Sequence, residues 1–289
     1  LSSVISAYGE PTLEVTTTDV KSKEKQQAIS KKNYHLITQE KQIDDWIKEA
    51  EETGELAIDT ETSSLDAHQA DLVGISLSTK IGKACYIPIG HKSKGCIKKE
   101  IVIKKLKPLL EDESVKKIGQ NIKFDFIVLY MQGINMNSME DTMLMSYVLD
   151  AGKNRHNMDA LSEIHLGHKT ISFKEIVGTG KKEINFSNVE LGKAMEYAAE
   201  DADITYRLYK IFSKSLKLEK LTNIYEMFEK PLIKILAFME IEGIKIDNKF
   251  LNVLSEKFAK KIQKLEKEVF KISKKEFNIA SPKQLGEII

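Results

Sequence analysis

The stretch Glu55-Leu-Ala-Ile-Asp-Thr-Glu-Thr62 organises the rest of this chain. Its apolar run, from Leu56 to Ile58, is of the kind that a buried strand needs. Asp59 and Glu61 follow two positions apart, and residues i and i+2 of a strand point to the same face of a sheet. We therefore expect two carboxylates to project side by side from the end of a core strand.

This pair of carboxylates indicates a metal site. Two like charges placed together are unfavourable unless something compensates them, and the usual compensation is a divalent cation with oxygen ligands. An accidental pair is the alternative, because 43 acidic residues among 289 give roughly six such pairs from composition alone. The position of the pair at the exit of an apolar strand favours the metal site.

Length and composition limit the class of protein. A chain of 289 residues with 42% hydrophobic residues can bury a core, as one large domain or two. No stretch has the length of a transmembrane span and no signal peptide opens the chain, so we expect no membrane partner. The two cysteines, Cys85 and Cys96, are too few for a disulfide framework and indicate reduced thiols in a cytosolic protein.

Charge is distributed unevenly along the chain. The net charge is +1, but residues 210–275 carry 16 lysines against nine acidic residues. A basic segment in the same chain as an acidic site is compatible with nucleic acid held next to metal ions. The alternative is a lysine-rich helix face that is simply solvated.

Hydrophobic periodicity predicts an α/β fold. Residues 1–33 show no sustained period and are interpreted as a linker or disordered tail. Five strands are expected, at 34–38, 55–62, 71–78, 83–89 and 115–119. Helices are expected at 42–53, 101–110, 121–131, 141–149, 158–166, from about 189, and at 221–242. The pattern predicts a mixed five-stranded sheet flanked by helices and followed by an all-helical segment.

Two further acidic residues sit at the ends of predicted elements. Asn121 and Asp125 are i and i+4 in a predicted helix and would share one face of it, and so are Tyr197 and Asp201. Each pair alone is also compatible with a helix cap or a surface acid. Three acidic motifs in chain order, each at the end of an element, favour a single site.

The three motifs, Asp59-Thr-Glu61, Asn121-x-x-x-Asp125 and Tyr197-x-x-x-Asp201, resemble those of the four-carboxylate 3′→5′ exonucleases, in the subclass with a tyrosine. The flanking sequences are similar to the proofreading domain of the bacterial DNA polymerase I family (family A polymerases). They are Thr60-Glu-Thr-Ser-Ser-Leu-Asp66, Ile118-Gly-Gln-Asn-Ile-Lys-Phe-Asp125, Arg155-His-Asn-Met-Asp-Ala-Leu161, Thr170-Ile-Ser-Phe173 and Tyr197-Ala-Ala-Glu-Asp-Ala-Asp203. Beyond residue 220, Glu229-Lys-Pro-Leu232 and Ile241-Glu-Gly-Ile-Lys-Ile-Asp247 resemble the start of that family's polymerase domain.

The resemblance implies an RNase H-like fold and a division of the chain into parts. Residues 34–214 would form the exonuclease domain, and 215–289 would form the start of the polymerase domain, with part of its thumb helices. The chain begins at Leu1 and ends at Ile289 before any polymerase catalytic motif, so we expect a fragment of a longer protein that incorporates no nucleotides. Nothing before residue 34 resembles a 5′ nuclease domain.

The resemblance also implies hydrolysis with two divalent metal ions, Mg²⁺ or Mn²⁺, with Zn²⁺ as an alternative at one site. Asp59, Glu61 and Asp201 would hold one ion, and Asp59 and Asp125 would approach the other. Tyr197 would orient the attacking water together with Glu61. Its ordinary pKa near 10 makes the phenol a poor base at neutral pH, so orientation is the expected role.

The DNA contacts implied by the resemblance surround this site. Leu65 would wedge between the last bases and Phe173 would stack on or flank the terminal base, although both side chains could instead be buried apolar residues. The terminal nucleotide would contact Thr62, Gln120 and Asn121, and a phosphate would contact Arg155. Phe124 stands where many relatives have tyrosine, which removes a hydroxyl and no metal ligand.

The expected substrate is a single-stranded DNA 3′ end and the product a dNMP, released by a monomeric bacterial protein in the cytoplasm, associated with the nucleoid. An RNase D-like RNA exonuclease would use the same chemistry, but the residues after 220 resemble a polymerase. A non-catalytic DNA-binding module is a third alternative. A polymerase in its own right is rejected because the palm residues are absent.

Overall fold

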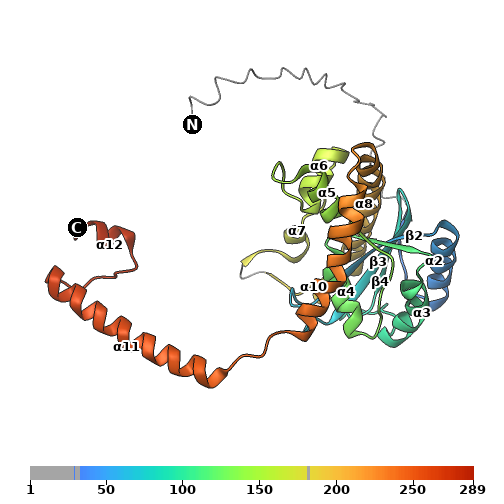
Figure 1. Ribbon diagram of the computed structural model, residues 1–289. Coiled ribbons are helices and arrows are strands. Elements are labelled where there is room, and N and C mark those ends of the chain that lie inside the picture. Colours follow the sequence, from blue (N-terminus) through green and yellow to red (C-terminus); the bar gives the residue numbers. More distant parts are fainter. Residues whose placement is uncertain (1–28, 30–32, 181–182) are drawn as a thin grey trace, which may run out of the picture. The chain divides into compact units, whose positions relative to one another are not determined.

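The computed structural model describes residues 29, 33–180 and 183–289 (Figure 1). The linker predicted at residues 1–33 lies outside the described residues, apart from positions 29 and 33. The chain forms two compact units, which divide between Ile241 and Glu242. Each unit is described on its own.

The first unit is built on one mixed sheet of six strands in the order β1-β4-β3-β2-β5-β6. The strands are β1 (Tyr34–Leu36), β2 (Glu55–Thr62), β3 (Leu72–Lys80), β4 (Lys83–Pro88), β5 (Lys116–Gly119) and β6 (Met139–Asp141). The pairs β2–β3 and β3–β4 are antiparallel, whereas β1–β4, β2–β5 and β5–β6 are parallel. The predicted α/β class with a mixed sheet is confirmed.

The predicted number of five strands is wrong, because β6 was missed. This strand has only three residues, two of them acidic, and a segment that short shows no alternation of polar and apolar residues. It exists because it pairs with β5, where Lys117 lies opposite Met139 and Gly119 opposite Asp141. That pairing is a tertiary contact, which local periodicity does not report.

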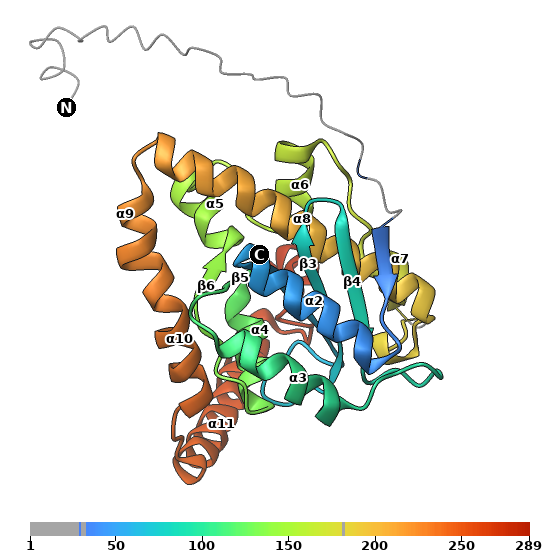
Figure 2. The same ribbon diagram turned by 90° about the vertical axis from the view of Figure 1, so that its right-hand side faces the viewer.

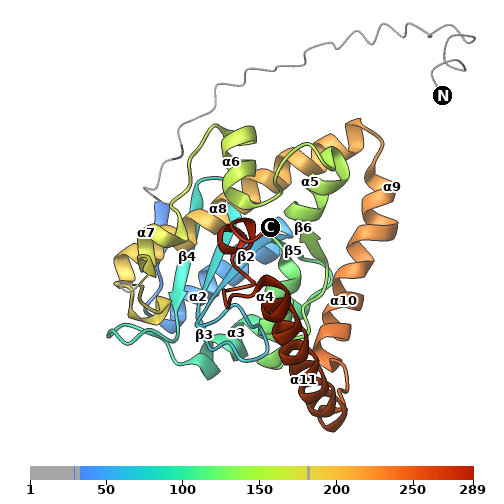
Figure 3. The ribbon, with the colours of Figure 1, turned by 90° about the vertical axis from the view of Figure 1, so that its left-hand side faces the viewer.

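Helices cover both faces of the sheet. One face carries α2 (Glu40–Thr53), α3 (Lys99–Glu111) and α4 (Ile122–Met131), and the other carries α8 (Leu191–Leu218) with α5 (Thr142–Asp150) and α6 (Met158–Leu166) packed against it. α2 and α3 are nearest the viewer in Figure 2 and behind the strands in Figure 3. Both faces of the central strands are therefore buried, as in other α/β sheets covered on two sides.

The alternation of side chains along β2 assigns the site residues to a face. Leu56 and Ile58 are fully buried in the core beneath α2, α3 and α4, whereas Ala57 is buried in the core beneath α8. Because side chains alternate along a strand, Asp59 and Glu61 follow Ala57 towards α8. Burying each large apolar side chain contributes about 1.5–3 kcal/mol, which anchors this strand end.

One buried carboxylate, Asp141, caps two helices. Its oxygens accept hydrogen bonds from the backbone N–H groups of Met143 and Leu144 in α5, and from those of Asn121 and Ile122 at the start of α4. Burial raises the pKa of Asp141 to about 6, against the lowering effect of these hydrogen bonds. The cap fixes the start of α4, the helix that bears Asp125, to the end of β6.

The helical chain after α8 is fastened to the edge of the sheet. It runs through α9 (Thr222–Ile224), the π-helical turn η4 (Tyr225–Glu229) and α10 (Lys230–Glu242). The buried hydroxyl of Tyr225 accepts the N–H of Asp141 at 2.9 Å and donates to Glu140 at 3.0 Å, and Lys230 pairs with Glu140 at 2.7 Å. The helix predicted at 221–242 therefore contains a π-turn where its tyrosine reaches β6.

The second unit contains α11 (Asn248–Ser273) and α12 (Pro282–Gly286). Asp247 caps α11 by accepting the N–H of Phe250 at 3.0 Å. Apolar residues recur along α11 at helical spacing, and its described side chains are not fully buried. Among the described residues, no helix is both long and apolar enough to cross a bilayer.

Replacing Tyr225 by phenylalanine should lower the free energy of unfolding by about 1–3 kcal/mol, because it leaves the buried N–H of Asp141 without its acceptor. Urea denaturation of both proteins measures the difference. Tyr147→Phe, at a ring that is 49% exposed, is the matched control and should change stability by less than about 0.5 kcal/mol. Equal stability of Tyr225→Phe and the wild type would show that this hydroxyl does not hold the helix to β6.

Candidate active site

The acidic motifs meet in one pocket of about 870 Å³ at the end of β2. Four of its carboxylates come from three elements: β2 supplies two, and α4 and α8 supply one each, while Glu183 from the segment before η3 also lines the pocket. The pocket is lined by Asp59, Thr60, Glu61, Thr62, Ser63, Ser64, Leu65, Gln120, Asn121, Phe124, Asp125, Met158, Phe173, Glu183, Ile184, Asn185, Phe186, Tyr197 and Asp201. Segments separated by more than a hundred residues in sequence thus share one cavity.

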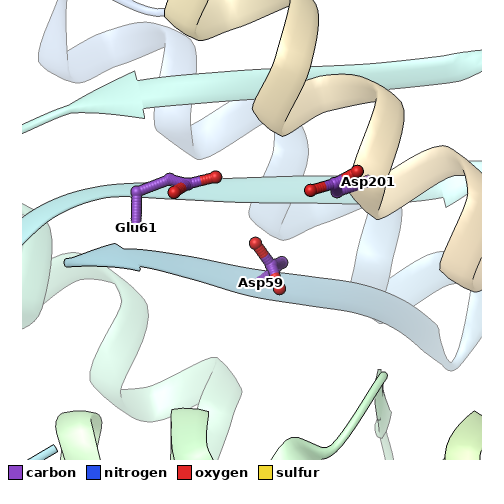
Figure 4. Close-up of side chains that lie close together, drawn as sticks. All are labelled: Asp59, Glu61 and Asp201. Atoms are coloured by element: carbon purple, nitrogen blue, oxygen red, sulfur yellow. The ribbon is translucent and has the colours of Figure 1, made fainter. Parts of the chain in front are cut away.

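Three carboxylates form the tightest group (Figure 4). Asp59 and Glu61 reach it from β2 and Asp201 from α8, and one oxygen of each lies within 4.8 Å of the others. Asp59 and Glu61 thus lie together, as the two-residue period of a strand predicts. Oxygen atoms at this spacing suit a hard divalent cation.

Asp125 reaches the same pocket from the opposite side of the sheet. Its Oδ1 accepts the backbone N–H of Thr60 at 2.9 Å and the hydroxyl of Thr60 at 2.6 Å. Thr60 lies between Asp59 and Glu61 in β2, so its side chain points towards α4 rather than α8. These two hydrogen bonds place the Asp125 carboxylate beside the strand that bears the other two.

The prediction that Asn121 and Asp125 share a helix face is wrong, because α4 begins one residue later. Asn121 is the N-cap residue and has left-handed backbone angles, with φ 62°. Asparagine tolerates this conformation better than most residues. Asn121 nevertheless lines the pocket, since the tight turn between β5 and α4 brings it to the same strand end.

The pKa of each of the four carboxyl groups from the acidic motifs lies well above its ordinary value. Loss of contact with water is the largest cause for Asp59, Glu61, Asp125 and Asp201, and a neighbouring carboxylate adds to it in each case. Within the described part of the chain, Oε1 of Glu61 is buried without a hydrogen-bond partner. A divalent cation would relieve both the repulsion and the unpaired oxygen, so the residues fit a metal site.

Tyr197 lies one helical turn before Asp201 on α8. Burial raises the pKa of its phenol further above 10, and the nearby carboxylates of Asp201, Glu61 and Asp59 add to the shift. Its hydroxyl lies close enough to Asp201 for the two groups to affect one another's pKa. Tyr197 therefore keeps its proton at neutral pH in the metal-free protein and can donate a hydrogen bond, which suits an orienting group better than a base.

An aromatic cluster surrounds Tyr197. The ring centroid of Phe186 lies 6.0 Å from that of Tyr197 and 6.1 Å from that of Phe173. The rings of Phe173 and Tyr197 meet edge to face, with their centroids 6.1 Å apart. Phe186 comes from η3 (Phe186–Asn188), a turn that the sequence pattern did not predict. Such ring contacts fix the orientation of the phenol.

Phe173 begins a short helix that was also missed, α7 (Phe173–Val177). A signal for it exists in the sequence: Ser172 precedes the helix and Glu175 follows three residues later, which is the pattern of a capping box. In the structure the Ser172 hydroxyl donates to Glu175 at 3.0 Å.

The residues predicted to contact DNA differ in their exposure to solvent and in their hydrogen bonds to the rest of the chain. Leu65 is 94% exposed and Phe173 is 45% exposed, so the alternative that both are buried apolar residues is wrong. The amide of Gln120 is held by the hydroxyl of Thr142 and the carbonyl of His156. Arg155 is exposed and, among the described residues, does not line the pocket.

Comparison with known families and proteins agrees with this geometry. A profile described as 3′–5′ exonuclease matches residues 34–217, which contain the whole sheet and all four carboxylates. This chain belongs to the 3′–5′ exonuclease family. DNA polymerase I of Rhizobium leguminosarum is 45% identical over 86% of this chain and 26% of that protein. DNA polymerase I of Pseudomonas aeruginosa is 38% identical over 89% of this chain and 29% of that protein.

The exonuclease chain therefore spans about a quarter of the length of these curated relatives. Among solved structures, the POL domain of Pol1 from M. smegmatis, in complex with DNA primer-template and dNTP, superposes with a TM-score of 0.69 at 19% identity, over 88% of this chain and 40% of that one. Brucella melitensis NrnC superposes with a TM-score of 0.54 at 24% identity, over 67% of this chain and 88% of that one. At these identities the likeness shows the fold.

Replacing Asp59 by asparagine should stabilise the metal-free exonuclease at neutral pH. The folded-state pKa of Asp59 lies well above 3.8, so this carboxyl group stabilises the fold below pH 3.8, and that contribution is lost as the pH rises through the raised pKa. Asparagine cannot ionise and escapes the loss. In EDTA, the melting temperature of Asp59→Asn should exceed that of the wild type by about 2–4 °C at pH 8 and match it near pH 4.

The control for this prediction is Asp45→Asn, which changes an exposed carboxylate on α2. Its difference from the wild type should stay small at both pH values. A difference between Asp59→Asn and the wild type that does not change with pH would contradict the electrostatic origin of the effect.

Proposed function

We propose that this chain hydrolyses 3′-terminal nucleotides from single-stranded DNA and releases dNMP, using two divalent ions, Mg²⁺ or Mn²⁺. The observation that carries the proposal is the convergence of four carboxylates, three of them buried and Asp59 half-buried, with Tyr197 in one pocket of an exonuclease-family domain. Bound ions of this kind activate water and stabilise a leaving oxygen when two lie about 3.5–4 Å apart. Zn²⁺ is an alternative ion at one of the sites.

The chain's own residues would divide the work between them. Asp59, Glu61 and Asp201 would hold one ion, and Asp59 together with Asp125 would hold the other. The protonated hydroxyl of Tyr197 would orient the attacking water with the carboxylate of Glu61. Burial of the site would exclude bulk water and strengthen each of these interactions.

The apolar and amide groups at the mouth of the pocket would position the strand end. Leu65 would wedge between the last bases and Phe173 would stack on the terminal base, and their exposure leaves both surfaces accessible. Thr62, Gln120 and Asn121 would contact the terminal nucleotide. Arg155, which lies outside the pocket lining, would contact a phosphate further along the strand.

We also propose a setting for this activity. The relatives named DNA polymerase I support a role as the proofreading part of a longer bacterial polymerase, acting as a monomer in replication and repair, in the cytoplasm near the nucleoid. Residues 34–214 would form the exonuclease domain and residues 215–289 the start of the polymerase domain. The RNase D-like and non-catalytic alternatives are not favoured, because the relatives are polymerases and all four carboxylates line the pocket.

A single-stranded oligonucleotide with a 5′ label should be shortened from its unlabelled end in Mg²⁺, and EDTA should stop the reaction. A duplex end should react more slowly, because its strands must separate before the last nucleotides can enter the pocket. Gel electrophoresis of the labelled products measures both rates. Release of the label in the first product, or cleavage in EDTA, would exclude the proposed reaction, and faster cleavage of a matched RNA would favour the RNase D-like alternative.

Two substitutions should separate metal binding from water orientation. Asp59→Ala should abolish both cleavage and Mn²⁺ binding, because Asp59 is proposed to contact both ions. Tyr197→Phe should keep Mn²⁺ and DNA binding but lower kcat by roughly 10²–10⁴-fold at most, the worth of a positioned catalytic group. Single-turnover rates and Mn²⁺ titration test the pair. Loss of Mn²⁺ binding in Tyr197→Phe, or near-normal cleavage by Asp59→Ala, would reverse these assignments.

A further inference from the structure

Glu200 is a fully buried carboxylate beside the site that binds a side chain and a backbone group of a neighbouring segment. It precedes Asp201 on α8 but, within the described residues, does not line the pocket. Its Oε1 accepts a hydrogen bond from Nε2 of His168 at 3.0 Å, and its Oε2 accepts the backbone N–H of Ile171 at 2.7 Å. Both partners lie in the segment 167–172, which joins α6 to α7.

The same segment is tied to α6 on its other side. The hydroxyl of Thr170 donates to Asp159 at 2.6 Å, and the hydroxyl of Ser162 donates to the carbonyl of His168 at 2.8 Å. Segment 167–172 is therefore held between α6 and α8 by side chains from both helices. On the α8 side, the buried carboxylate of Glu200 accepts the hydrogen bonds from His168 and Ile171. Hydrogen bonds to a carboxylate are stronger than those between neutral groups, so this side of the segment is firmly held.

Segment 167–172 ends directly before Phe173, the first residue of α7. Ile171, whose N–H is bound by Glu200, is two residues from Phe173, and the Phe173 ring contacts Tyr197 at 6.1 Å. Tyr197 lies on α8 three residues before Glu200, about one helical turn. Glu200 thus fixes the distance between the helix that carries Tyr197 and the backbone that carries Phe173.

We propose that Glu200 is a positioning residue, which holds the Phe173 ring where it can stack on the 3′-terminal base. This inference rests on the proposed function, because it assigns the stacking surface for the substrate of that same site. Glu200 itself touches neither the nucleotide nor the reacting atoms. Its loss frees segment 167–172 from α8, so Phe173 no longer presents a fixed face to the base.

A double-mutant cycle tests the proposal. Glu200→Ala should raise the KM for a single-stranded oligonucleotide by about 10-fold, within the range measured for the loss of one aromatic–base stack. In the Phe173→Ala background, Glu200→Ala should change KM by less than about twofold, because the stacking that it supports is already gone. Glu200→Gln, whose amide oxygen can still accept the Ile171 N–H, should restore KM to within about twofold of the wild type.

Binding without cleavage gives a second measurement that is independent of the reaction. In EDTA, an oligonucleotide that carries 2-aminopurine at its 3′ end should lose fluorescence on binding the wild type, through stacking on Phe173. The quenching should be weak with Glu200→Ala and Phe173→Ala and normal with Glu200→Gln. Tyr34→Phe, which removes a buried hydrogen bond to Asp203 on the same helix, is the control and should quench normally.

The outcomes separate the two proposals. A wild type that quenches 2-aminopurine but cleaves no DNA would overturn the proposed function and leave the placement of Phe173 supported. Equal increases in KM from Glu200→Ala in both backgrounds would overturn the positioning role, because a merely structural loss acts regardless of Phe173. Loss of Mn²⁺ binding in Glu200→Ala, with normal quenching, would also overturn it.

Discussion

Four carboxylates crowd together at the end of β2, and the surrounding fold must offset their repulsion. Burial raises the pKa of Asp59, Glu61, Asp125 and Asp201, and nearby carboxylates add to the shift, so the site opposes folding in the absence of a cation. The scaffold offsets this cost with apolar cores on both faces of β2. Because β3 pairs with β2 at both Asp59 and Glu61, the backbone that bears these two carboxylates is held in place.

The scaffold holds the carboxylates mainly through the backbones that bear them. Asp125 depends on α4, whose first N–H groups are bound by Asp141. Asp201 depends on α8, which is anchored two residues later where Asp203 accepts hydrogen bonds from the hydroxyl of Tyr34 and the N–H of Gly82. Because the fold holds these backbones in place, the free-energy cost of ordering the carboxylates around a cation would be lower.

The first compact unit extends past the residues that match the exonuclease family. The match ends at residue 217, whereas the compact unit continues to Ile241. Ile233 and Ala237 of α10 are buried in the same core as α2, α3 and α4. Together with the bonds of Tyr225 to β6, this burial makes the helices after α8 part of the scaffold, so a change in that segment reaches the edge of the sheet next to the Asp141 cap.

Features that depend on neighbouring residues could be predicted from the amino-acid sequence alone. The apolar run before Asp59, the period-two spacing to Glu61 and the helical spacing of Tyr197 and Asp201 were sufficient for the strand, the helix and the acidic motifs, because these periodicities are properties of neighbouring residues. The resemblance carried by those motifs then supplied the family. In contrast, the strand β6, the exposure of Leu65, and the contacts of Phe186 and Glu200 depend on how distant segments pack together. The contact between Thr60 and Asp125 is of the same kind. These two residues are 65 positions apart in the chain and are joined by two hydrogen bonds. A local pattern contains no information about which distant group will satisfy a buried polar atom, so those contacts follow from packing alone.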